Sequence, residues 1–150
     1  LLYQLKYKQE QNVIADLVEV AINFINNNWK DIIDAIIPIP PSRTPRKFQP
    51  VLEIAKGISA GIRIPCFDNI LVKVKEKPEL KNVFDFHERL AILTNNFIVN
   101  DNLSGLKQIL LFDDLFRSGA TLNAATEALS NKGIVEKVYV LTLTRTRILS

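Results

Sequence analysis

The sequence is poor in the residues that build disulfides and zinc sites. Its 150 residues include one cysteine, Cys66, and one histidine, His87. A single cysteine excludes an internal disulfide and a cysteine-rich zinc site, and it fits a reducing, cytoplasmic compartment. No signal peptide is visible, and no apolar run approaches the roughly 18 residues of a membrane span, so we expect no membrane insertion. Methionine is absent, so the chain lacks its own initiator and residues can be missing before Leu1.

The charge balance is only mildly basic. The chain has 19 Lys and Arg residues against 16 Asp and Glu residues, a formal net charge of +3 and a pI near 9.0. Such an excess is compatible with an anionic ligand, but it does not by itself argue for nucleic-acid binding. The basic residues are spread along the chain with acids between several of them. We therefore expect at most weak, salt-sensitive binding of single-stranded DNA.

Helical and extended patterns alternate along the chain. Apolar residues recur with a helical period in three segments, and four other segments read as strands, of which 32–39 is a nearly continuous apolar run. The predicted helices span 12–28, 50–60 and 120–131, and the predicted strands span 32–39, 69–74, 107–113 and 135–144. Gly61 and Gly133 are expected to close the second and third helices. This alternation predicts a single α/β domain over residues 1–150, with a mostly parallel sheet flanked by helices.

One segment, QILLFDDLFRSGATLNAATEAL at residues 108–129, carries the strongest functional signal. An apolar run ends in two adjacent acids, Asp113 and Asp114, and a short loop at residues 117–121 then leads into a helix. In parallel α/β sheets, ligands bind beyond the carboxyl ends of the strands. The free N–H groups and the dipole of a helix N-terminus attract an anion. The segment therefore predicts a ligand site at the end of this strand.

The loop itself suits a phosphate. Gly119 lets the backbone approach a ligand closely, while Ser118 and Thr121 add hydroxyl donors. Carboxylates that can bind sugar hydroxyls thus lie beside a nest for a phosphate, which indicates a sugar phosphate. The alternative is that an Asp near the turn only caps the helix. Capping needs one side chain and leaves the second acid unexplained, so the pair favours a ligand.

The string LLFDDLFRSGAT resembles the phosphoribosyl pyrophosphate (PRPP) signature of type I phosphoribosyltransferases. The resemblance implies their Rossmann-like fold and the transfer of a phosphoribosyl group. It also implies that Asp113 and Asp114 are the catalytic pair that binds the ribose 2- and 3-hydroxyls. The 5-phosphate would then be bound by Arg117, Ser118, Gly119, Ala120 and Thr121. At the first of these positions the family usually has Thr or a small residue instead of arginine.

Further segments resemble the ComF-like competence family, in the order in which that family has them. They are LLYQLKYKQEQNVIADL, IIPIPPSRTPRKFQPVLEIAKGI, LVKVKEKPELKNVFDFHERL and VYVLTLTRTR. This resemblance covers nearly the whole chain and implies a link to DNA uptake and natural transformation, with competence or recombination proteins as partners. Many members carry an amino-terminal zinc ribbon, which the single cysteine of this chain cannot build, so we expect the phosphoribosyltransferase domain alone.

PRPP carries a pyrophosphate as well as a 5-phosphate, so the resemblance implies a second group of cations. The candidates are Arg43, Lys73, Lys75 and Arg89. Guanidinium and ammonium groups suit a pyrophosphate, although each of these residues can equally be a solvated surface cation. The expected cofactor is Mg²⁺, a hard ion that bridges pyrophosphate and ribose oxygens. No side chain is predicted as a direct metal ligand.

Several functional interpretations stay open at this point. The chain can be an active phosphoribosyltransferase with an unknown acceptor, for which it shows no evident base. It can instead be a catalytically inactive module that senses PRPP, or a metabolic enzyme of base salvage. In the least specific interpretation, the acid pair only stabilises the fold. PRPP binding would exclude the last interpretation, and pyrophosphate release would separate the first from the second.

Overall fold

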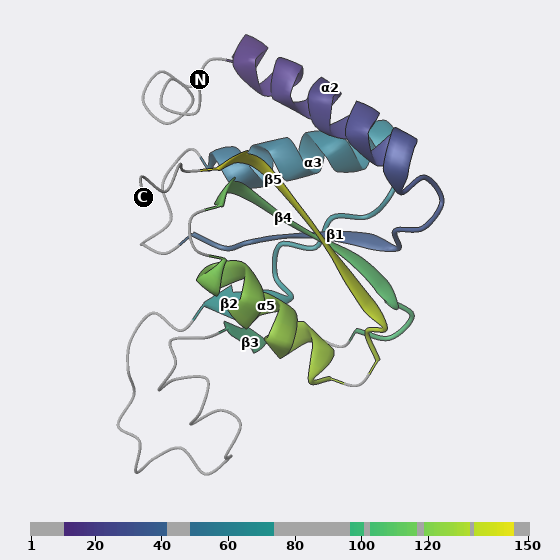
Figure 1. Cartoon of the computed structure of the whole chain (residues 1–150), viewed down its shortest axis with the longest axis vertical. Coiled ribbons are helices and arrows are strands. Elements are labelled where there is room, and N and C mark those ends of the chain that lie inside the picture. Colours follow the sequence, from purple (N-terminus) through teal and green to yellow (C-terminus); the bar gives the residue numbers. More distant parts are fainter. Residues whose placement is uncertain are drawn as a thin grey trace.

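The computed structural model describes residues 11–41, 49–73, 97–100, 103–116, 119–132 and 134–145. In chain order its elements are α2 (Gln11–Asn28), β1 (Ala35–Pro38), α3 (Pro50–Ile62), β2 (Leu71–Lys73), β3 (Phe97–Val99), β4 (Gln108–Phe116), α5 (Ala120–Ser130) and β5 (Lys137–Arg145) (Figure 1). No helix within these ranges combines the length and the apolar character that a membrane span requires.

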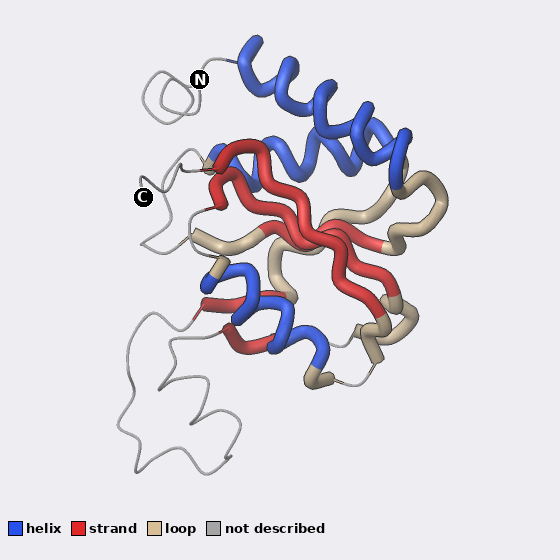
Figure 2. The backbone as a smooth tube through the Cα atoms, viewed as in Figure 1, coloured by secondary structure: helices blue, strands red, loops and turns tan. Residues whose placement is uncertain are grey.

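The main sheet has three parallel strands in the order β1-β4-β5, so β4 is central. Ile36 of β1 pairs with Leu110 of β4, which pairs in turn with Tyr139 of β5. On the other side of β1, Ile36 forms an isolated parallel bridge with Cys66. Figure 2 shows the three strands crossing the middle of the molecule with helices on both sides. The predicted α/β architecture, a mostly parallel sheet flanked by helices, is confirmed.

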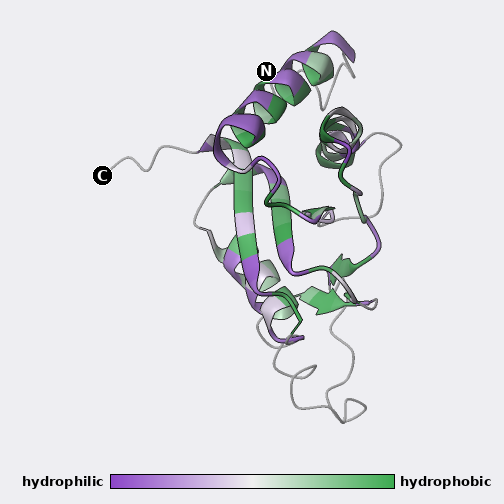
Figure 3. Ribbon diagram, turned by 90° about the vertical axis from the view of Figure 1, so that its right-hand side faces the viewer, coloured by the Kyte–Doolittle hydropathy of each residue, from purple (hydrophilic) through white to green (hydrophobic). Residues whose placement is uncertain are grey.

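Each face of the main sheet has its own apolar core, because successive strand residues point to opposite faces. Leu110 and Phe112 of β4 belong to the core formed with α2 and α3. Ile109 and Leu111 belong to the other core, which α5 forms with the antiparallel pair β2–β3. Figure 3 shows hydrophobic residues dominating the strands, while α2 carries both hydrophobic and hydrophilic residues. The apolar runs that predicted these strands are therefore explained by burial on both faces.

Helices α2 and α3 approach each other closely because α3 has glycines at the contact. A Cβ atom on Gly57 would lie 2.7 Å from Val18 Cγ2, and one on Gly61 would overlap Ile22 Cδ1. Both positions lie on one face of α3, since residues four apart are neighbours on a helix. Glycine inside a helix costs about 1 kcal/mol relative to alanine, and the close packing of α2 offsets that cost.

Two predicted ends of elements were wrong. Helix α3 does not end before Gly61; it continues to Ile62 and ends where Arg63 takes the left-handed conformation, with φ 60°. Strand β4 does not end at Asp113; it extends to Phe116 because β5 keeps pairing with it to Arg145. The acid pair therefore lies within the strand and not just after it.

Other predictions differ less from the structure. Strand β1 begins at Ala35 instead of residue 32, since the chain turns at Asp31, with φ 62°. Strand β2 covers only Leu71–Lys73 of the predicted 69–74. The strand β3 was not predicted, because its three residues give no recognisable period. The predicted helix closure at Gly133 lies outside the described residues.

Candidate functional site

The acid pair lies near the C-terminal end of the central strand, β4. Its backbone is bonded firmly to β5: Asp113 pairs with Thr142, and the Thr144 hydroxyl donates a 3.0 Å hydrogen bond to the carbonyl oxygen of Asp114. A central strand bonded to its neighbours is the most rigid part of such a fold. The two carboxylates are therefore attached to a backbone that holds their positions well.

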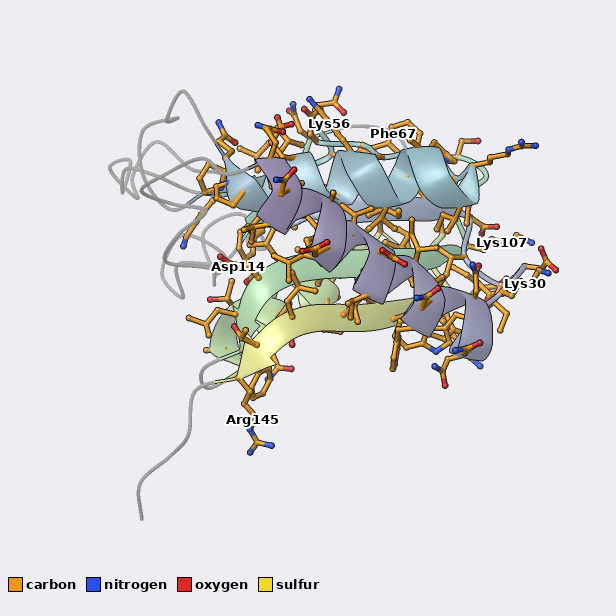
Figure 4. All side chains as sticks on the ribbon, turned by 90° about the horizontal axis from the view of Figure 1, so that it is seen from above. Lys30, Lys56, Phe67, Lys107, Asp114 and Arg145 are labelled. Carbon is orange, nitrogen blue, oxygen red and sulfur yellow. The ribbon has the colours of Figure 1, made fainter. Side chains whose placement is uncertain are left out.

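The two carboxylates have different surroundings. Asp114 is the one charged side chain in the described part of the chain that is buried, with 8% exposure. Asp113 is half-buried, and its Oδ1 accepts a 2.8 Å hydrogen bond from the backbone N–H of Asp114. Figure 4 shows Asp114 at the opposite end of the sheet from Lys107. Burying a carboxylate is costly unless it has polar partners, so the position of Asp114 demands a specific environment.

Gly119, part of the loop predicted to bind a phosphate, lies against the end of β4. This residue has φ 81° and ψ −2°, a left-handed conformation that favours glycine, and it is the N-cap of α5. No side chain caps the helix. A Cβ atom on Gly119 would lie 3.2 Å from two ring carbons of Phe116, so the ring packs directly against the turn. Ala120 and Thr121 follow as exposed residues of the first helical turn.

Gly119 connects two parts of the predicted site, the acid-bearing strand β4 and the start of α5. The strand that carries Asp113 and Asp114 ends at Phe116, whose ring contacts the start of α5 at Gly119. The N–H groups of a first helical turn have no acceptor within their own helix, so they can bind an anion. Asp113, Asp114 and the first turn of α5 thus lie at the same end of the sheet.

Lys73 lies on a different element. It is the last residue of β2 and pairs with Phe97 of β3, in the antiparallel pair that packs on the α5 side. Its Nζ lies 5.8 Å from the centre of the Phe97 ring, a cation–π distance. Sequence reasoning missed Phe97 because the contact depends on the register of a strand that it did not predict. It also missed the contact between Phe116 and Gly119, because residue spacing does not show the orientation of a side chain.

The remaining candidates lie outside the described residues. They are Arg43, Lys75, Arg89, Arg117 and Ser118. In the described part of the chain, no group of three or more His, Cys, Asp or Glu residues is arranged to hold a metal ion. Mg²⁺ usually keeps several waters and binds through one or two carboxylates together with substrate phosphates. Two aspartates near the end of β4, where α5 begins, are a donor set compatible with that mode.

The single thiol has no part in this site. Cys66 is half-buried on the far side of β1, where it forms the bridge to Ile36. Burial, and then the negative charge of Asp68, raise the pKa of the thiol to about 11, although Lys56 acts in the opposite direction. A thiol with so high a pKa is almost entirely protonated at neutral pH, and the thiolate is the nucleophilic form. The thiol is therefore a poor nucleophile.

Comparison with known proteins shows the fold. No protein-family model matches the sequence, and no curated protein matches it. Solved structures do match over most of the chain. A hypothetical protein from Neisseria gonorrhoeae with bound ppGpp has a TM-score of 0.57 and 16% identity, covering 90% of this chain and 68% of that one.

Two named enzymes match similarly well. The Helicobacter pylori xanthine-guanine-hypoxanthine phosphoribosyltransferase has a TM-score of 0.59 at 13% identity, covering 91% of this chain and 76% of its own. The orotate phosphoribosyltransferase from Aeropyrum pernix has a TM-score of 0.57 at 9% identity, covering 91% and 73%. The chain therefore has the fold of the type I phosphoribosyltransferases.

Proposed function

We propose that this chain binds PRPP at the C-terminal end of β4 and is a phosphoribosyltransferase-like protein of the ComF-like competence family. The observation that carries the proposal is the contact between the end of the acid-bearing strand and Gly119 at the start of α5. Asp113 and Asp114 bind the ribose hydroxyls. The 5-phosphate occupies the turn from Arg117 to Thr121, where backbone N–H groups and the helix dipole favour an anion.

The pyrophosphate needs cations from other parts of the chain. Lys73 is the candidate that the structure describes, and its ammonium group rests against the Phe97 ring. A contact of this kind restrains a flexible lysine without neutralising it, so the charge is kept for a ligand. Arg43, Lys75 and Arg89 are the further candidates. Mg²⁺ bound with PRPP would neutralise charge on the leaving pyrophosphate.

The residues of the chain would act mainly by positioning and by electrostatics. Loss of pyrophosphate from the anomeric carbon leaves a positively charged, oxocarbenium-like sugar. The carboxylates of Asp113 and Asp114 stabilise that charge and fix the ribose through its hydroxyls. A left-handed glycine turn holds the 5-phosphate, so the sugar is fixed at both ends. No described residue is an evident base for the acceptor, whose identity we leave to the experiment below.

Titration calorimetry tests the ligand. PRPP with Mg²⁺ should bind saturably, and replacing both aspartates (Asp113→Asn with Asp114→Asn) should weaken binding about tenfold or more, since contacts to charged groups contribute about 1.5–3 kcal/mol each. The matched control is Asp16→Asn with Glu19→Gln, which removes the same charge from the exposed face of α2. That variant should bind as the wild type does. Unchanged affinity in a folded Asp113/Asp114 double variant would refute the site.

Turnover is a separate question from binding. Release of pyrophosphate in the presence of purine, pyrimidine or pyridine bases would establish a transferase and identify the acceptor. Saturable binding without release would favour a PRPP-sensing module. The structural match to a protein with bound ppGpp favours one more candidate ligand, because ppGpp also carries diphosphate groups. Displacement of PRPP by ppGpp in the same titration would show that the site accepts it.

The biological role rests on the ComF-like resemblance. Deleting the gene in its host should lower the frequency of natural transformation, and a plasmid copy should restore it while the Asp113/Asp114 double variant should not. Undiminished transformation, together with efficient conversion of bases to nucleotides by the pure protein, would indicate a metabolic salvage enzyme instead. Any DNA binding by the protein alone should be weak and should fall steeply with salt.

A further inference from the structure

The acid pair lies on a part of β4 that pairs with one neighbouring strand among the described residues. The pairing of β1 with β4 ends at Phe112, and Asp113 is the next residue of β4. On the other side, β5 pairs with β4 as far as its last residue, Phe116. Figure 4 shows Asp114 and Arg145, the last residue of β5, at the same end of the sheet. Among the described strands, β5 is therefore the neighbour that holds the acid pair in the sheet.

A side chain of β5 makes the contact with the backbone of Asp114. In the register of the two strands, Asp113 pairs with Thr142 and Leu115 pairs with Thr144. Between these pairs, the carbonyl oxygen of Asp114 accepts a 3.0 Å hydrogen bond from the Thr144 hydroxyl. Thr144 is an exposed residue, so burial of its hydroxyl does not by itself require this bond. The hydroxyl thus reinforces the strand pairing at the more buried residue of the acid pair.

The backbone of Asp114 also connects Thr144 to the other carboxylate. The N–H of Asp114 donates a 2.8 Å hydrogen bond to Asp113 Oδ1. Asp114 therefore has a side-chain partner at each backbone polar group, Asp113 at the N–H and Thr144 at the carbonyl. Peptide groups are planar, and only two soft dihedral angles separate the N–H of a residue from its C=O. A bond that fixes the carbonyl of Asp114 therefore restricts the direction of its N–H, and with it the carboxylate of Asp113.

We propose that Thr144 is a positioning residue for the acid pair. Its hydroxyl fixes the backbone of Asp114 and thereby directs the carboxylates of Asp113 and Asp114 toward the ribose hydroxyls. The inference rests on the proposed function, because it concerns the ligand that the acid pair binds. It assigns a role to β5, a strand that contributes none of the predicted site residues. Hydrogen bonds weaken steeply when their geometry is distorted, so Thr144 contributes to affinity without touching the ligand.

Titration calorimetry with PRPP and Mg²⁺ measures the effect on binding. Thr144→Val keeps the shape of the side chain without the hydroxyl, and it should raise the PRPP dissociation constant about three- to tenfold, the equivalent of one neutral hydrogen bond. Thr144→Ser keeps the hydroxyl and should bind as the wild type does. The matched control is Thr126→Val on α5, where the threonine is half-buried and its hydroxyl makes no hydrogen bond to the described residues. Equal affinities of the wild type and Thr144→Val would overturn the proposal.

Amide hydrogen exchange separates positioning from a general loss of stability, and it needs no ligand. In Thr144→Val, the N–H of Asp114 should exchange about three- to tenfold faster, because its local opening becomes easier. The internal reference is the N–H of Leu111, a fully buried residue earlier in β4, which should change little. Equal acceleration of both amides would mean that Thr144 only stabilises the fold. A wild type that does not bind PRPP would refute the proposed function, and the exchange of Asp114 would then decide alone whether Thr144 holds the acid pair.

Discussion

Aspartates lie at both ends of β4, and they make different contacts. At the N-terminal end of β4, Asp34 Oδ2 accepts hydrogen bonds from the backbone N–H groups of Lys107 at 3.0 Å and Gln108 at 2.8 Å. At the other end, Asp113 accepts the N–H of its own neighbour, Asp114, which is itself buried. One carboxylate binds the start of a strand, whereas the other two lie near the end of β4, whose last residue, Phe116, contacts the left-handed turn at Gly119.

These contacts lead us to expect different roles for the aspartates at the two ends. The carboxylate of Asp34 accepts N–H groups that would otherwise lack a partner where β4 starts, so the needs of the backbone explain it. Asp113 likewise accepts a backbone N–H, that of Asp114, but Asp114 is a buried carboxylate at the C-terminal end of the central strand, where ligands bind in parallel α/β sheets. Changes at Asp34 should therefore lower stability alone, whereas changes at the other end should weaken binding.

The largest loss of stability is expected at Gly119. Replacing it by alanine should lower the free energy of unfolding by about 2 kcal/mol, since a left-handed conformation costs other residues about 1–2 kcal/mol and the new Cβ meets the Phe116 ring. The control is Gly105→Ala, where φ is 82° but nothing lies within 4 Å. Urea unfolding should show a smaller loss there, and equal losses would mean that the Phe116 contact is unimportant. PRPP affinity should fall only in the Gly119 variant.

A smaller loss of stability is expected at the N-terminal end of β4. Asp34→Ala should destabilise the protein by about 1.5 kcal/mol, the low end for bonds to a charged group, because water can reach part of the site. PRPP affinity measured by calorimetry should stay within error of the wild type. The control is Asp16→Ala on the exposed face of α2, which should change little. Weakened PRPP binding in the Asp34 variant would break the distinction between the two ends.

The smallest change in stability is expected at the ion pair of Lys107 and Glu136, near the N-terminal end of β4. Lys107 Nζ lies 3.7 Å from Glu136, and both side chains are more than 60% exposed, at 64% and 63%. Lys107→Ala should change the free energy of unfolding by at most about 0.5 kcal/mol, because water and salt screen an exposed pair. Urea unfolding at low and high salt would measure it. A loss that persists at high salt would mean that Lys107 stabilises the strand by packing and not by charge.

Much of the fold could be predicted because β1 and the first part of β4 are continuous apolar runs buried on both faces. The helical period of α2 likewise matches the positions that face its core. The ends of elements were less predictable. Arg63 takes a conformation that glycine usually provides, so Gly61 gave a misleading signal for the end of α3. No local pattern shows that β5 continues to pair and thus extends β4 beyond the acid pair.

The site was predictable to the extent that it is contiguous in the sequence. Asp113, Asp114 and Gly119 lie within a stretch of seven residues. Predicting a strand followed by a helix therefore placed all three at one end of the sheet. The rest depends on contacts between distant segments. Lys73 meets Phe97 only through the register of β2 and β3, and Asp34 meets Lys107 across the start of β4. Such contacts follow from tertiary packing, which spacing along one segment does not encode.

The order of the strands also bears on how the protein is made. β1 precedes β4 by about half the length of the chain, yet Ile36 has Leu110 as its neighbour. A ribosome therefore delivers β1, fully apolar, long before the strand that covers its edge has been synthesised. Until then the nascent chain carries an uncovered apolar strand, a surface that chaperones bind and that aggregates. The same pairing that centres the acid-bearing strand in the sheet thus leaves β1 without its neighbour until β4 has been synthesised.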